Sequence, residues 1–152
     1  MAGPTRRNQP HLISWSWRFE CIELFKKHEF DGSLIVPEFA SPKKSEKSKT
    51  QIAMWEFRGL QLAKVILFWI PRTPELIGLT TNCEWGYWMA RERQKMIYGR
   101  PDDAYRTDYL DAMWRADADA TLNDNFDGIC DAEIYHTMED TVVAAIELFG
   151  KT

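Results

Sequence analysis

The strongest constraint on the fold is the apolar run at residues 65–70, which reads Val-Ile-Leu-Phe-Trp-Ile without a polar interruption. This run is far shorter than the roughly 20 residues that a helix needs to cross a bilayer. Strands that are apolar at every position are buried on both faces, as they are in parallel sheets. The run therefore predicts a buried strand over residues 64–70 within a parallel sheet.

Short strands and helices alternate along the rest of the chain. Apolar residues at helical spacing predict helices over 12–28, 51–62, 82–93 and 105–116, and one or two more helices between about 131 and 149. Short apolar segments predict strands over 33–36 and 95–98, and the lysine-rich segment 41–50 predicts a loop. This alternation predicts an α/β fold with three layers, and 152 residues fit one domain over 1–152.

Composition and charge argue against several classes of function. The 19 basic and 23 acidic residues give a net charge of −4, which lacks the positive field of a general nucleic-acid binder. Cys21, Cys83 and Cys130 contain no Cys-x-x-Cys pair and favour a reducing, cytoplasmic compartment. The three histidines are scattered without metal-ligand spacing, and no export signal is evident. We therefore expect no metal, no membrane and no nucleic acid among its partners.

Turns that contain arginine follow the predicted strands. In parallel α/β sheets, ligands bind beyond the carboxyl ends of the strands. The turns at these ends contain Arg6, Glu38, Arg72 and Arg100. We expect these side chains to converge on a local anion site. The alternative is that the glycines and prolines of these turns merely end the strands, which leaves the arginines unexplained.

Residues 78–88, Gly-Leu-Thr-Thr-Asn-Cys-Glu-Trp-Gly-Tyr-Trp, follow the buried strand and open a helix. Thr81 and Glu84 match a capping box, in which both side chains bond free backbone N–H groups at the helix start. Alternatively, Glu84 lies in the first helical turn and faces the ligand crevice, where the helix dipole favours its anionic form. The aromatic residues that would then surround it, ready to stack on a base or sugar, are Trp85, Tyr87 and Trp88.

Several short motifs occur in order between residue 2 and about residue 111. They are Ala2-Gly3-Pro4-Thr5-Arg6, Ser16-Trp17-Arg18, Val36-Pro37-Glu38, Gln51 with Trp55-Glu56, Phe68-Trp69-Ile70-Pro71-Arg72, Leu79-Thr80-Thr81-Asn82 with Glu84 and Gly86, and Tyr98-Gly99-Arg100-Pro101. Together they resemble the nucleoside 2-deoxyribosyltransferase-like family. The resemblance implies a three-layer, flavodoxin-like parallel sheet flanked by helices, with its first strand shortened or missing here. It also implies a homodimer or larger homo-oligomer.

The same resemblance implies cleavage or transfer at the N-glycosidic bond of a nucleoside or nucleotide, with Glu84 as the nucleophile. We expect Glu38 to be the second carboxylate of the site, although a solvent-exposed loop position explains this glutamate equally well. For Glu56 the sequence leaves two alternatives open, that it faces solvent or that it reaches the site. Trp55 fits a core position as well as a binding site. The expected substrate-binding residues are Gly3, Pro4, Arg6, Arg18, Trp55, Arg72, Thr81, Asn82 and Arg100. No cofactor is required, and the alternative function is non-catalytic binding of a nucleotide or nucleotide signal.

Overall fold

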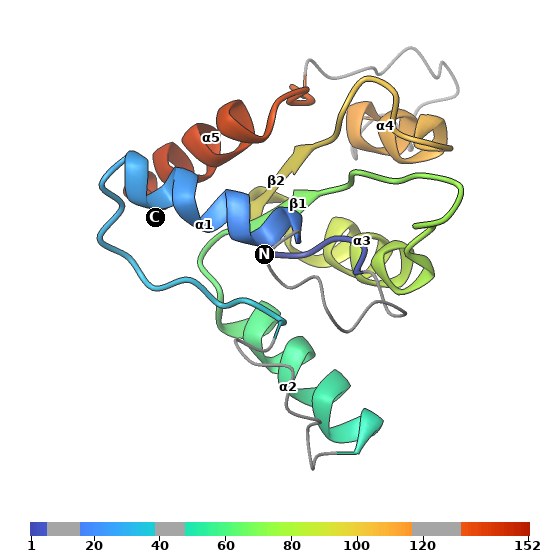
Figure 1. Ribbon diagram of the computed structural model, residues 1–152, viewed down its shortest axis with the longest axis horizontal. Coiled ribbons are helices and arrows are strands. Elements are labelled where there is room, and N and C mark those ends of the chain that lie inside the picture. The colour runs from blue at the N-terminus through green and yellow to red at the C-terminus, as the bar shows by residue number, and fades with distance from the viewer. Residues whose placement is uncertain (6–15, 39–47, 117–131) are drawn as a thin grey trace.

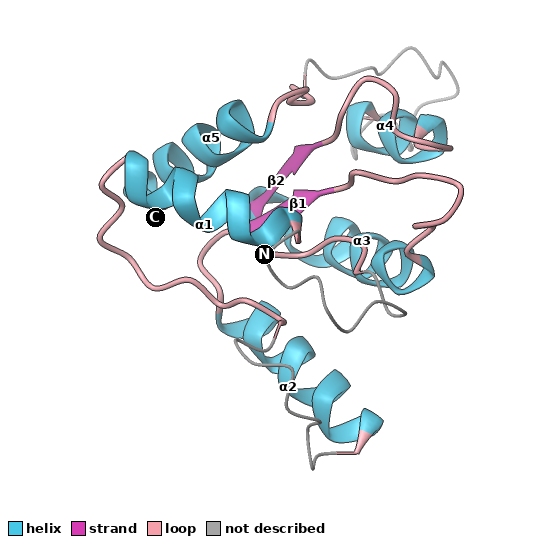
Figure 2. Ribbon diagram, in the orientation of Figure 1, coloured by secondary structure: helices cyan, strands magenta, loops and turns pink. Residues whose placement is uncertain are grey.

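A short parallel sheet forms the centre of the molecule (Figures 1 and 2). The structure, a computed structural model, describes residues 1–5, 16–38, 48–116 and 132–152. Strand β1 (Ile66–Trp69) pairs in parallel with β2 (Met96–Gly99), in a register that sets Ile66 opposite Met96. All four residues of β1 are buried. The expected buried strand and its parallel pairing are therefore confirmed.

Helices occupy most of the remaining described chain. They are α1 (Trp17–Lys27), α2 (Lys49–Leu62), α3 (Leu79–Glu92), α4 (Asp108–Arg115) and α5 (Met138–Lys151), with a 3-10 turn η2 at Arg93–Lys95. The α/β class is thus confirmed, and helix α3 connects the two parallel strands. No helix in these described segments combines the length and the apolar content that crossing a membrane requires.

One predicted helix start and one predicted strand are corrected. Helix α2 begins at Lys49 because Ser48 and Gln51 form a capping box, in which the Ser48 hydroxyl accepts from the Gln51 N–H and the Gln51 amide oxygen accepts from the Ser48 N–H. The predicted strand over 33–36 is wrong. No described strand pairs with this segment, and Leu34 packs as irregular chain against the core cluster of α1 and α5.

Side chains of β1 alternate between the two faces of the sheet. Phe68 packs with Trp85 of α3 and Trp114 of α4 in one core cluster. Leu67 packs with Phe25 of α1 and Val142 of α5 in the other. Helices therefore cover both faces of the sheet. An ion pair between Lys27 and Glu139, 2.6 Å long, connects α1 and α5.

Single-residue bridges extend the sheet on both sides. Ala2 bridges Phe68 in parallel, and its N–H donates to the Leu67 carbonyl at 2.8 Å. On the other side, Tyr135 bridges Gly99. Ala2 thus lies where the shortened first strand was expected. Its position brings the following residues, Gly3 and Pro4, next to β1 and into the wall of a cavity.

Candidate functional site

A cavity of about 1180 Å³ opens between the start of the chain, helix α2 and the connection from β1 into α3. Many of the expected site residues line it together. The expected residues that the structure brings into this lining are Gly3, Pro4, Arg18, Trp55, Thr81 and Glu84. Glu56, whose position the sequence left open, also lines it.

Helix α3 begins at Leu79, two residues before Thr81. Its N-cap is Gly78, which has φ +64° and makes no side-chain capping bond, and the Thr81 N–H donates to the Gly78 carbonyl. The expected capping box of Thr81 and Glu84 is therefore wrong. Glu84 lies in the second helical turn, so the expectation that it profits from the first-turn dipole is wrong as well.

Gly78 is required by close packing as well as by its backbone conformation. A Cβ atom at this position would lie 2.6 Å from the Pro4 Cβ. We expect Gly78→Ala to lower the free energy of unfolding by about 1–3 kcal/mol, because the left-handed conformation is strained for alanine. Urea denaturation measures this loss. Gly86→Ala, in the same helix with nothing within 4 Å of the added Cβ, should instead stabilise by up to about 1 kcal/mol, and similar losses in both variants would contradict the argument.

The Glu84 carboxyl is partly buried within the cavity. Burial, together with a smaller contribution from the negative charge of Glu56, raises the pKa of Glu84 to about 7, and the positive charge of Arg18 acts in the opposite direction. A carboxyl group with a pKa near 7 exchanges its proton readily at neutral pH. The cavity therefore holds a titrating carboxyl beside a second acidic side chain.

Arg18 is 2% exposed and is held by three acceptors. Its Nη1 donates to Glu38 Oε1 and to Thr5 Oγ1, both at 2.9 Å, and its Nη2 donates to the Gly3 carbonyl at 2.8 Å. The Ser16 hydroxyl donates to the same Glu38 oxygen at 2.7 Å. Arg18 thus reaches the cavity, whereas Glu38 serves as its counter-ion and does not line the cavity.

The aromatic wall of the cavity differs from the one expected. Trp85 and Trp88 are each 1% exposed and belong to the core cluster on the α3 face of the sheet, so the expectation that they stack on a ligand is wrong. Their helical spacing turns them toward β1 and β2, where Trp85 contacts Phe68 and Tyr98 edge to face. Trp55 is 48% exposed, which excludes the core position, and it lines the cavity.

The expected convergence of the arginines on this cavity is wrong for Arg72 and Arg100. Arg72 donates to Asn82 Oδ1 at 2.6 Å, and neither residue lines the cavity. Arg100 donates from Nε to Asp111 at 3.0 Å and is likewise outside the lining. Local partners hold both guanidinium groups away from Glu84. Arg6 lies outside the described residues.

Metal-ligating groups do not gather in the part of the chain that the structure describes. No cluster of three or more His, Cys, Asp or Glu side chains could hold an ion there. Cys21 is a buried free thiol and Cys83 an exposed one, and Cys130 lies outside the described residues.

Comparisons with known proteins found no relative of this chain. No family model, no curated protein and no solved structure matches this chain.

Proposed function

We propose that this protein cleaves or transfers at the N-glycosidic bond of a nucleoside or nucleotide, with Glu84 as the nucleophile. The observation that carries the proposal is the position of Glu84 in a large cavity together with Glu56 and the exposed indole of Trp55. The motifs that resemble the nucleoside 2-deoxyribosyltransferase-like family supply the reaction class. A three-layer, flavodoxin-like sheet is part of the same proposal, supported by the parallel β1–α3–β2 unit and by helices on both faces.

The reaction proceeds in two displacements at the anomeric carbon. In the first, an oxygen of ionised Glu84 bonds to that carbon while the bond to the base nitrogen breaks, and the base leaves with the bonding electrons and gains a proton. In the second, water or another base attacks the same carbon and breaks the ester to Glu84. Two such steps each have a lower barrier than one direct displacement.

We assign the acid–base role to Glu56 in place of Glu38. Glu56 lines the same cavity as Glu84, and its charge acts on the Glu84 carboxyl. Glu38 is neutralised by Arg18 and lies outside the lining. In this role Glu56 donates the proton that the leaving base gains and later accepts one from the attacking water.

Trp55 provides a flat apolar face for the base. Its indole is half exposed at the cavity, and stacking of a base on an aromatic side chain contributes about 1–3 kcal/mol.

Helix α2, which carries Trp55, extends away from the sheet (Figure 1) and also exposes Met54 and Leu62. These apolar side chains support the proposal of a homo-oligomer, which stays a prediction.

Release of free base is the direct test of the proposed function. The purified protein is incubated with nucleosides, their 5′-monophosphates and NAD, and the products are separated by chromatography. We expect free base from at least one substrate, at a rate that falls about tenfold per pH unit below pH 7, because protonation of Glu84 removes the nucleophile.

Three other outcomes have different meanings. Saturable binding of nucleotides with every ligand recovered intact would support the non-catalytic alternative. If the protein shows no binding and releases no base, both functions would be overturned. A rate that rises as the pH falls below 7 would overturn the role of Glu84 as an ionised nucleophile while leaving the reaction class in place.

A further inference from the structure

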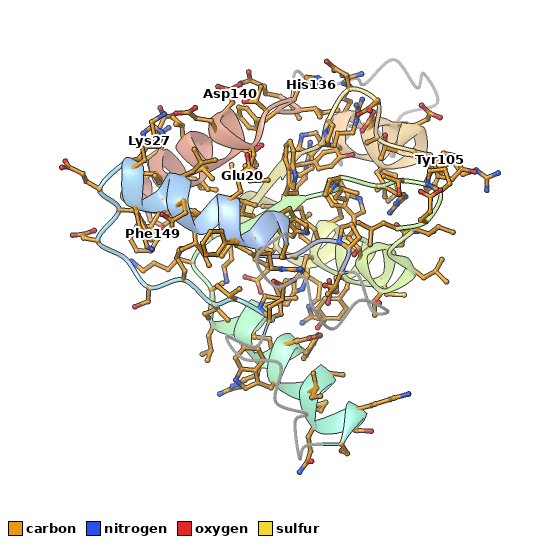
Figure 3. All side chains as sticks on the ribbon, in the orientation of Figure 1. Glu20, Lys27, Tyr105, His136, Asp140 and Phe149 are labelled. Atoms are coloured by element: carbon orange, nitrogen blue, oxygen red, sulfur yellow. The ribbon has the colours of Figure 1, made fainter. Side chains whose placement is uncertain are left out.

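A second, smaller cavity of about 360 Å³ lies between the connection from β1 to α3 and the loop that precedes α4. Its lining residues are Arg72, Pro74, Ile77, Leu79, Asn82, Tyr105 and Arg106. It shares only Ile77 and Leu79 with the large cavity and contains none of its carboxylates. Figure 3 shows that Tyr105 lies at the edge of the molecule. The cavity opens at the molecular surface beside the exposed Arg106.

The guanidinium group of Arg72 is buried, and no carboxylate of the described chain pairs with it. Arg72 is 5% exposed, and its Nη atoms donate to two neutral acceptors, Asn82 Oδ1 and the Arg106 carbonyl at 3.0 Å. Its Nε is buried and has no hydrogen-bond partner. Within the described chain no carboxylate forms an ion pair with it. Burial accordingly lowers the pKa of Arg72.

Two other shielded arginines show how this fold normally compensates such a charge. Arg18 pairs with Glu38, and Arg100 pairs with Asp111. Arginine is rarely buried unless its charge is paired, because removing a charge from water costs several kcal/mol. Arg72 is the exception among these three arginines. An anion from solution would supply the counter-charge that the described part of the chain does not provide.

A second arginine, Arg106, lines the same cavity. Arg106 is exposed, has φ +51°, and its side chain lies over the Tyr105 ring at 5.1 Å. The backbone of Arg106 contacts Arg72 through its carbonyl while its side chain stays accessible. Among the residues that the structure describes, two arginines and no acidic residue line the cavity, and Pro74 and Leu79 give it an apolar side.

We propose that this second cavity binds the oxyanion group, phosphate or carboxylate, of a small organic ligand. Arg72 and Arg106 pair with the oxyanion, because arginine forks match the geometry of both groups. Tyr105 and the apolar residues contact the uncharged part of the ligand. A volume of about 360 Å³ is large enough for a compact ligand. This site is separate from the proposed function and does not depend on it.

Titration of the full chain with inorganic phosphate, and separately with acetate, tests this site by amide NMR at constant ionic strength. We expect saturable shifts of the Asn82, Tyr105 and Arg106 amides with at least one of the two anions. Saturation with phosphate alone would identify a phosphate ligand, and saturation with acetate alone a carboxylate. Shifts that stay linear with both anions would overturn the site. The readout is binding, so it does not depend on whether base release is observed.

Variants at two exposed arginines separate this site from general electrostatic attraction. Arg106→Gln should weaken the saturating anion at least tenfold, because one charge-assisted contact is lost. Arg115→Gln, at an exposed position of α4 outside the cavity, changes the net charge equally and should leave the affinity unchanged. Equal weakening in both variants would overturn the proposal. Since Arg106 is exposed, its replacement should leave the fold intact.

Discussion

Glu84→Gln is expected to abolish base release and, above neutral pH, to stabilise the folded protein. The amide keeps the shape of the side chain but cannot attack the anomeric carbon. Burial raises the pKa of Glu84 from 4.5 to about 7, so ionisation costs the folded state more than the unfolded state. At about 1.4 kcal/mol per pKa unit, reduced for partial exposure to solvent, the gain in unfolding free energy is about 2 kcal/mol at pH 8.

The difference in unfolding free energy between the wild type and Glu84→Gln depends on pH. Below about pH 4.5 the carboxyl is protonated in both states, so wild type and variant should be equally stable. The destabilisation of the wild type grows as the pH rises through the interval between 4.5 and 7, and it is complete above pH 7. Urea denaturation at pH 5 and pH 8, together with the base-release assay, measures both effects.

Glu147→Gln is the matched control for this variant. It removes the same charge at an exposed position of α5 and should change neither stability nor activity appreciably. If Glu84→Gln retains substantial turnover, Glu84 is not the nucleophile. A loss of stability at pH 8 would show that the carboxylate is better accommodated in this cavity than its pKa indicates.

Glu38→Ala is expected to lower the free energy of unfolding by about 3 kcal/mol. The substitution leaves the guanidinium of Arg18, which is 2% exposed, without its counter-ion, and an unpaired buried charge is strongly destabilising. It also removes the acceptor of the Ser16 hydroxyl. For a domain whose total stability is about 5–15 kcal/mol, this is a large fraction, and urea denaturation at pH 7 measures it.

A surface ion pair gives the comparison for this prediction. Glu23 pairs with Lys26 at 2.7 Å on α1, with both side chains at least half exposed. Glu23→Ala should therefore cost less than about 1 kcal/mol. A Glu38→Ala variant that loses no more stability than Glu23→Ala would mean that solvent or another group compensates Arg18. The proposed assignment of Glu38 as a structural counter-ion would then fail.

Local patterns in the sequence determined the secondary structure and the parallel pairing. The run at residues 65–70 has no polar position, so only a strand buried on both faces accommodates it, and β1 is that strand. Helical spacing predicted each of the five described helices, with errors confined mainly to their ends. The exception is the segment 33–36, because a strand also needs a partner, and apolar composition alone cannot provide one.

The candidate site was only partly predictable, because its contacts join segments that are distant in the sequence. The motif residues Glu84, Arg18 and Trp55 do line one cavity, yet nothing in their spacing places Glu56 in the same cavity. That proximity depends on how α2 lies relative to α3. Because the two side chains line the same cavity, the charge of Glu56 raises the pKa of Glu84. The periodicity of a single helix does not reveal such proximity between two helices.

Tertiary structure also decided which charged and aromatic side chains are available to a ligand. Arginines follow three strand ends in the sequence, but Arg100 is neutralised by Asp111, whereas Arg72 has no acidic partner in the described chain. Trp85 faces the sheet, whereas Trp55 is exposed. Sequence determines which residues are apolar, charged or helical. Burial and pairing depend on the packing of several elements at once, and these decide whether a side chain stabilises the fold or can bind a ligand.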